Sequence, residues 1–325
     1  MSQYRIYLTR KIPEAGLKLL RPHCQMEIFS EDHPIPRELL LEKVREVEGL
    51  LCLLSDPIDR EVIDAAPRLR VISNYAVGYN NIDVEYATRK GIVVTNTPGV
   101  LTDATADLTW ALLLAVARRI VEGDSMMRQG QFRGWSPMLL LGQEVKGKTL
   151  GIVGAGRIGT AVAERSRGWN MNILYYDRGE NRYLEQELNA RRVELEELLE
   201  QSDFVSLHVP LTAETHHLID EQALRRMKRS AYLINTARGA VVDEAVLVRA
   251  LREGWIAGAA LDVYEHEPEL TPGLSELSNV VLAPHIGSAT IDTRNKMAEI
   301  AARNLLDGLN GKRPQFPVNP RVFEQ

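Results

Sequence analysis

Short apolar segments rich in branched side chains alternate with amphipathic segments along most of the chain. Pro13 is expected to begin one helix, and Asp59, just after Pro57, is expected to cap another. Strands that alternate with helices in this way indicate a parallel sheet with helices on both faces. In the first third, the predicted strands are 5–8, 26–29, 49–53, 69–73 and 92–95.

A second alternation follows a long helix that is predicted from about Thr102 to Val121, with Thr102 or Asp103 as its cap. Residues 129–148, with their glycines, proline and exposed-looking apolar side chains, are predicted to form a loop. The six strands predicted after it make a complete dinucleotide-binding sheet by count: 149–153, 172–176, 203–207, 231–235, 256–261 and 280–282.

The closing amphipathic helix, from Asp292 to about Leu309, has no strand after it. We expect this helix to return to the first domain, which makes that domain discontinuous. The length of 325 residues agrees with two domains, since single cores rarely grow past roughly 250 residues. The pattern therefore predicts an α/β protein of two domains, each built on a parallel sheet.

Composition narrows the classes of function. Apolar residues make up 45% of the chain and charged residues 26%, which is typical of globular proteins. The formal net charge of −5 argues against a nucleic-acid partner. Cys24 and Cys52 are the only cysteines, which disfavours a secreted disulfide scaffold. The N-terminus lacks the apolar core of a signal peptide, and the longest apolar run, 110–117, is too short to span a bilayer. A soluble, cytoplasmic protein with no membrane partner is expected.

A glycine-rich turn lies between the first strand and the first helix of the second alternation. Gly154, Gly156 and Gly159 are spaced as a dinucleotide-binding turn requires, with a strand before them and a helix over about 158–167 after them. These glycines permit a tight turn, close approach of a pyrophosphate, and close packing of helix on strand. The next strand ends at Asp177, where a carboxylate can accept the ribose hydroxyls of NAD.

The choice between the two nicotinamide cofactors stays open at this point. Asp177 favours NAD because its charge repels a 2′-phosphate. Arg157 follows Gly156 and Arg178 follows Asp177, so both are close enough to the predicted ribose site to pair with a 2′-phosphate, and NADP stays an alternative.

Three polar residues follow predicted strands of the same sheet, at the edge where doubly wound sheets bind ligands. Arg238 lies in NTARG, Glu267 in DVYEHEP and His285 in APHIGS. Singly, each has an ordinary structural explanation, but three at neighbouring strand ends indicate a catalytic site. Arg suits a carboxylate, His can give a proton to a developing alkoxide, and Glu can orient the imidazole and favour its protonated form. Together they fit the reduction of a 2-oxo acid.

These segments, with NYAVGYNNID at 74–83 and VTNTPGVLTDATADLTWALLLAVARR at 94–119, resemble the D-2-hydroxyacid dehydrogenase family and its glyoxylate/hydroxypyruvate reductase branch. The resemblance covers about the whole chain. It implies a Rossmann-type cofactor domain at 100–286 and a flavodoxin-like substrate domain at 1–99 plus 287–325, both doubly wound, with NAD(P)H-dependent reduction of glyoxylate or hydroxypyruvate to the D-2-hydroxy acid. Another substrate specificity within the family, or a nucleotide-sensing corepressor-like binding protein, is the alternative.

The resemblance also implies roles for individual residues. Arg238 would bind substrate, His285 would be the acid/base and Glu267 its partner. The backbone amides of Val77 and Gly78 would hold the substrate carboxylate, and Ser288 would line the pocket. The residues implied in cofactor binding are Thr105, Gly154, Ala155, Gly156, Arg157, Ile158, Gly159, Asp177, Arg178, Val209, Pro210, Thr215, Thr236, Ala237, Arg238, Asp262, His285 and Gly287.

A segment at about 120–147 resembles the dimer-contact loop of this branch, so a homodimer is expected. Trp135 would either enter the partner's active site or pack in the dimer interface. No metal site is predicted. The adjacent pair His216 and His217 cannot easily share one tetrahedral site, no third ligand is spaced nearby, and both are expected at the surface.

Overall fold

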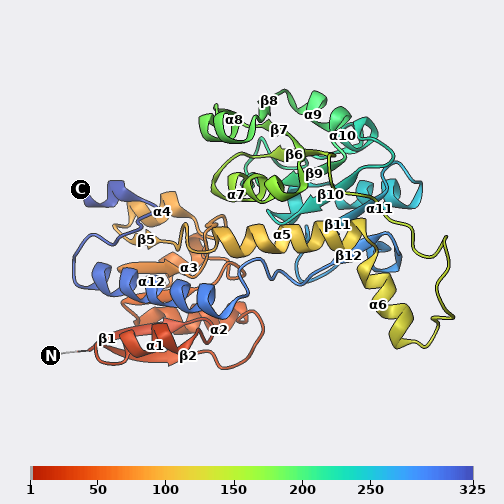
Figure 1. Cartoon of the computed structure of the whole chain (residues 1–325). Coiled ribbons are helices and arrows are strands. Elements are labelled where there is room, and N and C mark those ends of the chain that lie inside the picture. The colour runs from red at the N-terminus through yellow and green to blue at the C-terminus, as the bar shows by residue number, and fades with distance from the viewer. Residues whose placement is uncertain (1–2, 325) are drawn as a thin grey trace. The chain divides into compact units, whose positions relative to one another are not determined.

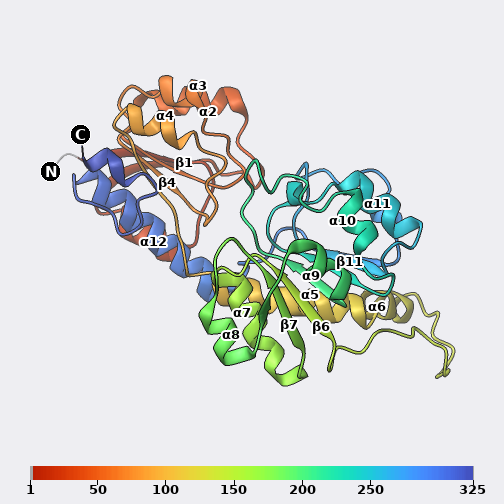
Figure 2. The ribbon, with the colours of Figure 1, turned by 90° about the horizontal axis from the view of Figure 1, so that it is seen from above.

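The computed structural model describes residues 3–324, which divide into two compact units. The chain crosses from the first unit to the second between Leu101 and Thr102, and it returns between Gly287 and Ser288. The first unit is therefore made of two separate stretches of sequence. Figures 1 and 2 show the closing helix α12 beside the strands of the N-terminal stretch.

Unit 1 is built on a five-stranded parallel sheet in the order β2-β1-β3-β4-β5. That order is the flavodoxin-like one, which confirms the predicted fold class. Its strands are β1 Tyr4–Leu8, β2 Cys24–Ile28, β3 Gly49–Cys52, β4 Val71–Asn74 and β5 Val93–Thr95. Its helices are α1 Glu14–Leu20, α2 Arg37–Lys43, α3 Arg60–Asp64, α4 Val84–Arg89 and α12 Ile291–Leu309.

Two apolar layers cover the faces of this sheet. One contains Leu40, Val62 and Ala87 from α2, α3 and α4, and the other contains side chains of α1 and α12. The closing helix is tied to the sheet by the Ser73 hydroxyl, which donates to the carbonyl of Ala301 at 2.9 Å. Asp59 caps α3 as predicted, accepting from the amide of Val62.

Unit 2 is built on a seven-stranded parallel sheet in the order β12-β11-β10-β9-β6-β7-β8. The six predicted strands are all present, and the order reverses between β6 and β9, as in a Rossmann-type sheet. The strands are β6 Thr149–Val153, β7 Asn172–Tyr176, β8 Arg191–Arg192, β9 Phe204–Leu207, β10 Tyr232–Asn235, β11 Gly258–Leu261 and β12 Val280–Leu282. The edge strand β8 was missed because two residues show no periodicity.

Helices cover both faces of this second sheet. Side chains of α5 and α7 pack on one face, and those of α9, α10 and α11 pack on the other. The helices are α5 Thr102–Ala117, α6 Ile120–Arg128, α7 Arg157–Arg165, α8 Arg182–Leu188, α9 Leu195–Gln201, α10 Glu221–Arg226 and α11 Glu244–Arg252.

The predicted single helix up to Val121 is wrong at its end. α5 stops at Ala117, and Arg119 adopts a left-handed conformation with φ of 53°, after which α6 runs in a new direction. An isolated left-handed residue ends an α-helix because it turns the chain out of the helical path. Thr102 is the first helical residue of α5 rather than a residue before it. Among residues 3–324, no helix has the length and apolar character needed to cross a bilayer.

Candidate active site

The glycine turn predicted to bind a dinucleotide joins β6 to α7. Gly154 has φ of +98°, and a Cβ built on it would lie 2.8 Å from the carbonyl carbon of His208. A Cβ on Gly159 would lie 2.1 Å from the carbonyl oxygen of Gly154. A Cβ on Gly156 would meet nothing within 4 Å, so the backbone is open there. The turn leaves room for a bulky anion at the N-terminus of α7, as a pyrophosphate requires.

Asp177 directly follows β7 and fastens this turn. Its Oδ2 accepts a hydrogen bond from the amide of Ala155 at 2.7 Å, and its Oδ1 accepts from the amide of Gly179 at 3.3 Å. A carboxylate has about four acceptor positions, so ribose hydroxyls can still be accommodated. The sequence indicated the ribose role of Asp177, whereas its contact with the turn appears only in the structure.

A third arginine contacts the backbone of Arg178, one of the two arginines that the sequence singled out. Arg157 and Arg178 are exposed, and Arg192, in β8, donates to the carbonyls of Asp177 and Arg178 at 2.9 and 3.0 Å. Arg192 reaches this place because β8 pairs with β7. Positive charge is therefore gathered close to the carboxylate that is predicted to disfavour NADP.

Arg238, Glu267 and His285 lie in the loops that follow β10, β11 and β12. Nδ1 of His285 is 2.8 Å from Oε2 of Glu267, while Oε1 of Glu267 accepts from the amide of Tyr264 at 3.0 Å. The guanidinium of Arg238 donates to the carbonyl of Ala237 at 2.6 Å. The structure thus brings these three predicted catalytic residues together within unit 2.

Burial and the attraction between opposite charges shift the pKa values of Arg238 and Glu267. Burial lowers the pKa of Arg238, and the nearby Glu267 carboxylate opposes that shift. Burial alone would raise the pKa of Glu267, but the hydrogen bond and charge of His285 and the amide of Tyr264 hold it below its ordinary value. Glu267 is therefore ionised at neutral pH and can accept a hydrogen bond from the imidazole.

Asp262, directly after β11, holds the loop that carries His285. Its two carboxylate oxygens accept from the amides of Ile286 and Gly287, each at 2.7 Å. Burial raises the pKa of Asp262, against the effect of these two amides and of the charge on His285. His285 itself has φ of 53°, a conformation that the clamped amides on its C-terminal side help to maintain. The sequence indicated only a cofactor contact for Asp262.

Close packing holds the loops after β10 and β11 together. A Cβ on Gly239 would lie 1.8 Å from the carbonyl carbon of Tyr264, so only glycine fits after Arg238. The Tyr264 hydroxyl donates to the carbonyl of Ala283 at 2.8 Å, which joins the end of β12 to the same group. The sequence shows Gly239 only as part of the NTARG motif, whereas the structure explains why a glycine is required at this position.

Several predicted cofactor contacts have structural partners in unit 2. Thr105 donates to the carbonyl of Gly287 at 3.2 Å, and a buried hydrogen bond of 2.9 Å joins the hydroxyls of Thr109 and Thr236. The Thr215 hydroxyl donates to the carbonyl of Pro210 at 2.6 Å and so shapes the loop after β9. Ile158 lies in the first turn of α7, Val209 packs on the core, and the amide of Ala237 donates to Asn235.

In unit 1, the two residues predicted to hold a substrate carboxylate follow β4. The carbonyls of Val77 and Gly78 accept from the side-chain amides of Asn96 and Asn74, at 2.7 and 2.8 Å. Among the residues that the structure describes, nothing accepts from the backbone N–H of either. Two fixed peptide groups with available N–H donors suit an anion. Ser288 opens the second stretch of this unit, where its carbonyl accepts from Thr290.

Trp135 and the histidine pair His216 and His217 lie away from the trio of predicted catalytic residues. Trp135 is 84% exposed in the loop after α6 and lies outside the trio's contacts. The expectation that His216 and His217 have no third ligand nearby is wrong, because Nε2 of His217 lies 2.6 Å from Oε1 of Glu265. Glu265 is 48 positions away in the sequence, so spacing could not reveal it. His216 is exposed as expected, while His217 is partly buried.

Comparisons with known proteins point to one family. Residues 110–287 match the family model described as D-isomer specific 2-hydroxyacid dehydrogenase, NAD binding domain. The chain is 56% identical over 324 residues to the glyoxylate reductase of Thermococcus kodakarensis, in a match that covers 98% of this chain and 97% of that protein.

Solved structures agree with that match. A protein of Thermus thermophilus has a TM-score of 0.91 and 49% identity, over 97% of this chain and 99% of that one. The NADPH-dependent glyoxylate/hydroxypyruvate reductase of Sinorhizobium meliloti, solved with NADP and malonate, has a TM-score of 0.86 and 34% identity, over 98% and 97%.

The lowered pKa of Glu267 predicts how an uncharged replacement affects stability. Glu267→Gln should lower the thermal stability at neutral pH, and the deficit should shrink in acid. A carboxylate whose native pKa is depressed stabilises the fold above its unfolded value, here 4.5, and that stabilisation is lost as pH falls through the native pKa. Thermal unfolding from roughly pH 3 to pH 7 measures the difference. Glu269→Gln, at an exposed neighbouring position, is the control, and a pH-independent deficit for Glu267→Gln would contradict the assignment.

Proposed function

Because the chain belongs to the D-isomer specific 2-hydroxyacid dehydrogenase family, we propose that it reduces glyoxylate or hydroxypyruvate to the D-2-hydroxy acid. The observation that supports this most directly is the meeting of Arg238, Glu267 and His285 at one edge of a Rossmann-type sheet. The names of the relatives support the class of substrate. The protein is a nicotinamide-dependent oxidoreductase.

The proton for this reduction comes from His285. Its Nδ1 is occupied by Glu267, so Nε2 is the nitrogen that faces the substrate oxygen. The contact with the Glu267 carboxylate fixes the orientation of the ring, and proton transfer from the ring neutralises the developing alkoxide. Oxidation uses the same contacts in reverse, with neutral His285 accepting the proton.

Arg238 provides the positive charge. Its planar guanidinium carries five N–H donors in a fork, a geometry that suits a substrate carboxylate and carbonyl. Burial strengthens such a contact because the surrounding medium screens it less than water does. The backbone amides of Val77 and Gly78, with Ser288, are proposed to bind substrate from unit 1.

The residues of the glycine turn fit a nicotinamide dinucleotide. When bound, that cofactor supplies the hydride to C2 of the substrate. The open backbone at Gly156 and the α7 N-terminus would hold the pyrophosphate, and Asp177 would accept the adenosine ribose hydroxyls. We propose NAD as the preferred cofactor. Arg157, Arg178 and Arg192 keep NADP possible.

Turnover of small 2-oxo acids tests this proposal. The protein should oxidise NADH in the presence of glyoxylate and hydroxypyruvate, measured by the loss of absorbance of the reduced nicotinamide. Arg238→Lys retains charge but loses the fork, so kcat/KM should fall about ten- to a hundredfold, mainly through KM, as expected for a lost charge-assisted hydrogen bond.

The matched control is Arg226→Lys, which alters an exposed arginine of the same unit paired with Glu200. It should leave both constants unchanged. Firm NADH binding without turnover of any 2-oxo acid in the panel would contradict the proposal and favour the alternative of a nucleotide-sensing binding protein. Turnover of other 2-oxo acids alone would indicate a different specificity within the family.

Cofactor choice has its own prediction. Asp177→Asn keeps an oxygen that can accept from the amide of Ala155, so the glycine turn is preserved, but it removes the negative charge. The ratio of kcat/KM for NADH to that for NADPH should fall by about tenfold, equal to roughly 1.4 kcal/mol of relieved repulsion. An unchanged ratio would show that Asp177 does not discriminate between the two cofactors.

We also propose a homodimer formed through the segment 120–147. Eight of the sixteen large apolar side chains that are exposed among the described residues lie between Ile120 and Leu141. Exposed apolar groups gathered on one segment mark a contact surface. Beside them is a cavity of about 600 Å³, bordered by α6, the loop after it and β12. Figure 1 shows this loop extending away from the sheet of unit 2.

Sedimentation equilibrium should give twice the chain mass of 36.5 kDa, and Trp135→Ala should distinguish the two roles for Trp135. A side chain that packs in the interface would weaken the dimer on truncation, by about 2 kcal/mol or more if it is a hot spot. A side chain that enters the partner's active site would raise KM with little change in mass. A monomer at all concentrations would contradict the dimer.

A further inference from the structure

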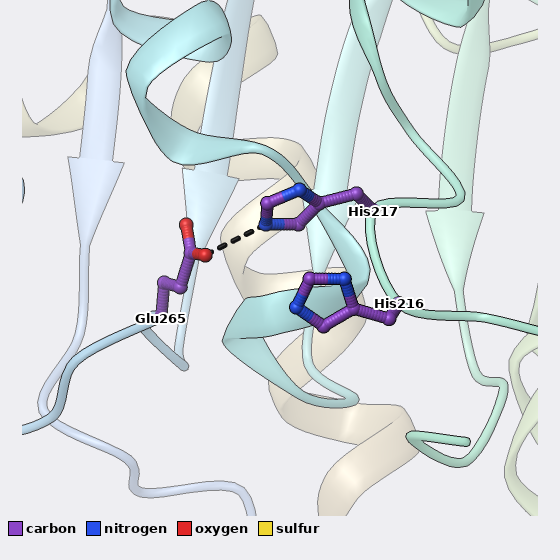
Figure 3. Close-up of side chains that lie close together, drawn as sticks. All are labelled: His216, His217 and Glu265. Carbon is purple, nitrogen blue, oxygen red and sulfur yellow. Dashed lines mark hydrogen bonds and ion pairs between the residues drawn. The ribbon is translucent and has the colours of Figure 1, made fainter. Parts of the chain in front are cut away.

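Three side chains with metal-binding atoms meet in unit 2 outside the trio. His216 and His217 lie in the loop after β9, and Glu265 lies in the loop after β11. One ligand atom from each falls within 4.8 Å of the others. Figure 3 shows both imidazoles on the same side of their loop, with the Glu265 carboxylate directed at His217. The arrangement offers two nitrogens and one oxygen to a shared point.

The local backbone makes this arrangement possible. His217 has φ of 51°, in the left-handed region that residues with a Cβ seldom adopt. Neighbouring residues in extended backbone point to opposite sides, whereas here the two rings stack with centroids 4.0 Å apart and 26° between their planes. The amide of His217 donates to the carbonyl of Ala240 at 2.9 Å, which anchors the unusual conformation. Such conformations cost free energy and are often found where a side chain must be aimed.

The hydrogen bond between His217 and Glu265 does not account for the position of His216. Within residues 3–324, neither imidazole nitrogen of His216 has a hydrogen-bond partner, and the ring lies against His217. Its exposed side chain would be free to turn into solvent if the pair alone mattered. The stacked ring instead keeps a second nitrogen near the carboxylate.

We propose that His216, His217 and Glu265 bind a divalent transition-metal ion of the Zn²⁺ class, with water completing the coordination. Imidazole and carboxylate together suit Zn²⁺, and Co²⁺, Ni²⁺ and Cu²⁺ accept the same ligands. Tetrahedral ligation with bonds of about 2.0–2.1 Å places ligand atoms roughly 3.3 Å apart. The 2.6 Å between His217 and Glu265 must therefore widen slightly, and His216 must close in, which side-chain rotations allow.

Asp243 is placed to support the site. One of its oxygens caps α11 by accepting from the amide of Val246, and the other lies 3.9 Å from Nδ1 of His217. That nitrogen is on the opposite side of the ring from the one that faces Glu265. Histidines that bind metals commonly donate their second N–H to a carboxylate, which fixes the ring and raises its basicity. Closing by about 1 Å would bring Asp243 into hydrogen-bond range.

The bound ion would join two loops of unit 2. One contains Thr215 and follows β9, while the other contains Glu267 two residues beyond Glu265. The Glu265 amide also donates to the buried Glu244 carboxylate at 2.8 Å, so its loop is firmly attached to α11. Binding to the folded chain alone raises its stability by mass action. The ion should therefore raise the unfolding temperature, and this inference does not depend on the proposed reduction.

Co²⁺ is the probe for the test, because its visible absorption reports coordination directly. The full chain is first treated with a chelator, then titrated with Co²⁺ and back-titrated with Zn²⁺. We expect one Co²⁺ per chain, absorption bands that Zn²⁺ abolishes, and a higher unfolding temperature with Zn²⁺. Absence of these bands at millimolar Co²⁺ would overturn the proposal.

Four variants locate the site. His216→Ala removes an exposed ring, and His217→Gln retains an N–H donor for Glu265 without an imidazole nitrogen. Glu265→Gln removes the charged ligand. Each of these three variants should weaken Co²⁺ binding by about tenfold or more, because the loss of one ligand of three should lower the affinity at least as much as the loss of a supporting hydrogen bond to a ligand. His33→Ala removes another exposed histidine beside a carboxylate, Glu31, and should bind as the parent does. Unchanged affinity in His216→Ala, or lost binding in His33→Ala, would place the ion elsewhere and overturn the assignment.

Discussion

The carboxyl ends of β10, β11 and β12 lie side by side because the three strands are parallel and adjacent. The hydrogen bond between His285 and Glu267, and the position of Arg238 near the Glu267 charge, depend on this alignment. The loops approach so closely that Gly239 has no room for a Cβ against the backbone of Tyr264. Successive parallel strands need a crossover connection between them, so residues that are distant in the sequence reach the same edge.

Carboxylates hold this edge in different ways. Asp262 uses both oxygens on the backbone amides that follow His285, so it positions the imidazole through the chain rather than through the ring. Glu267 contacts the imidazole itself, and its lowered pKa keeps it charged. Asp177 likewise holds the glycine turn, by accepting a hydrogen bond from the backbone amide of Ala155. Buried or half-buried carboxylates are stable here because backbone amides satisfy them.

The two loops after β9 and β11 link the trio to the proposed metal site. Glu265 and Glu267 are two residues apart, yet one is directed at His217 and the other at His285. In an extended strand, two residues that are two positions apart point to the same side. The turn that contains Glu265 and Glu267 therefore has to direct their side chains to different partners. Glu265 is further bound to the N-terminus of α11 through Glu244. A single loop thereby connects a proton-transfer pair to a cluster of metal-binding atoms.

The amino-acid sequence was enough to predict the α/β class, the six long strands of unit 2, the glycine turn, and the three polar residues at strand ends. These features are local, because periodicity, turn chemistry and the position of a residue after a strand can each be recognised within a segment of about twenty residues. The break at Arg119, the two-residue β8 that brings Arg192 to Asp177, and the clamp of Asp262 on the His285 loop could not be predicted in this way. Glu265 beside His217 belongs with them. Each of these depends on backbone conformation or on segments far apart in the chain, and such groups meet only when the chain packs in three dimensions.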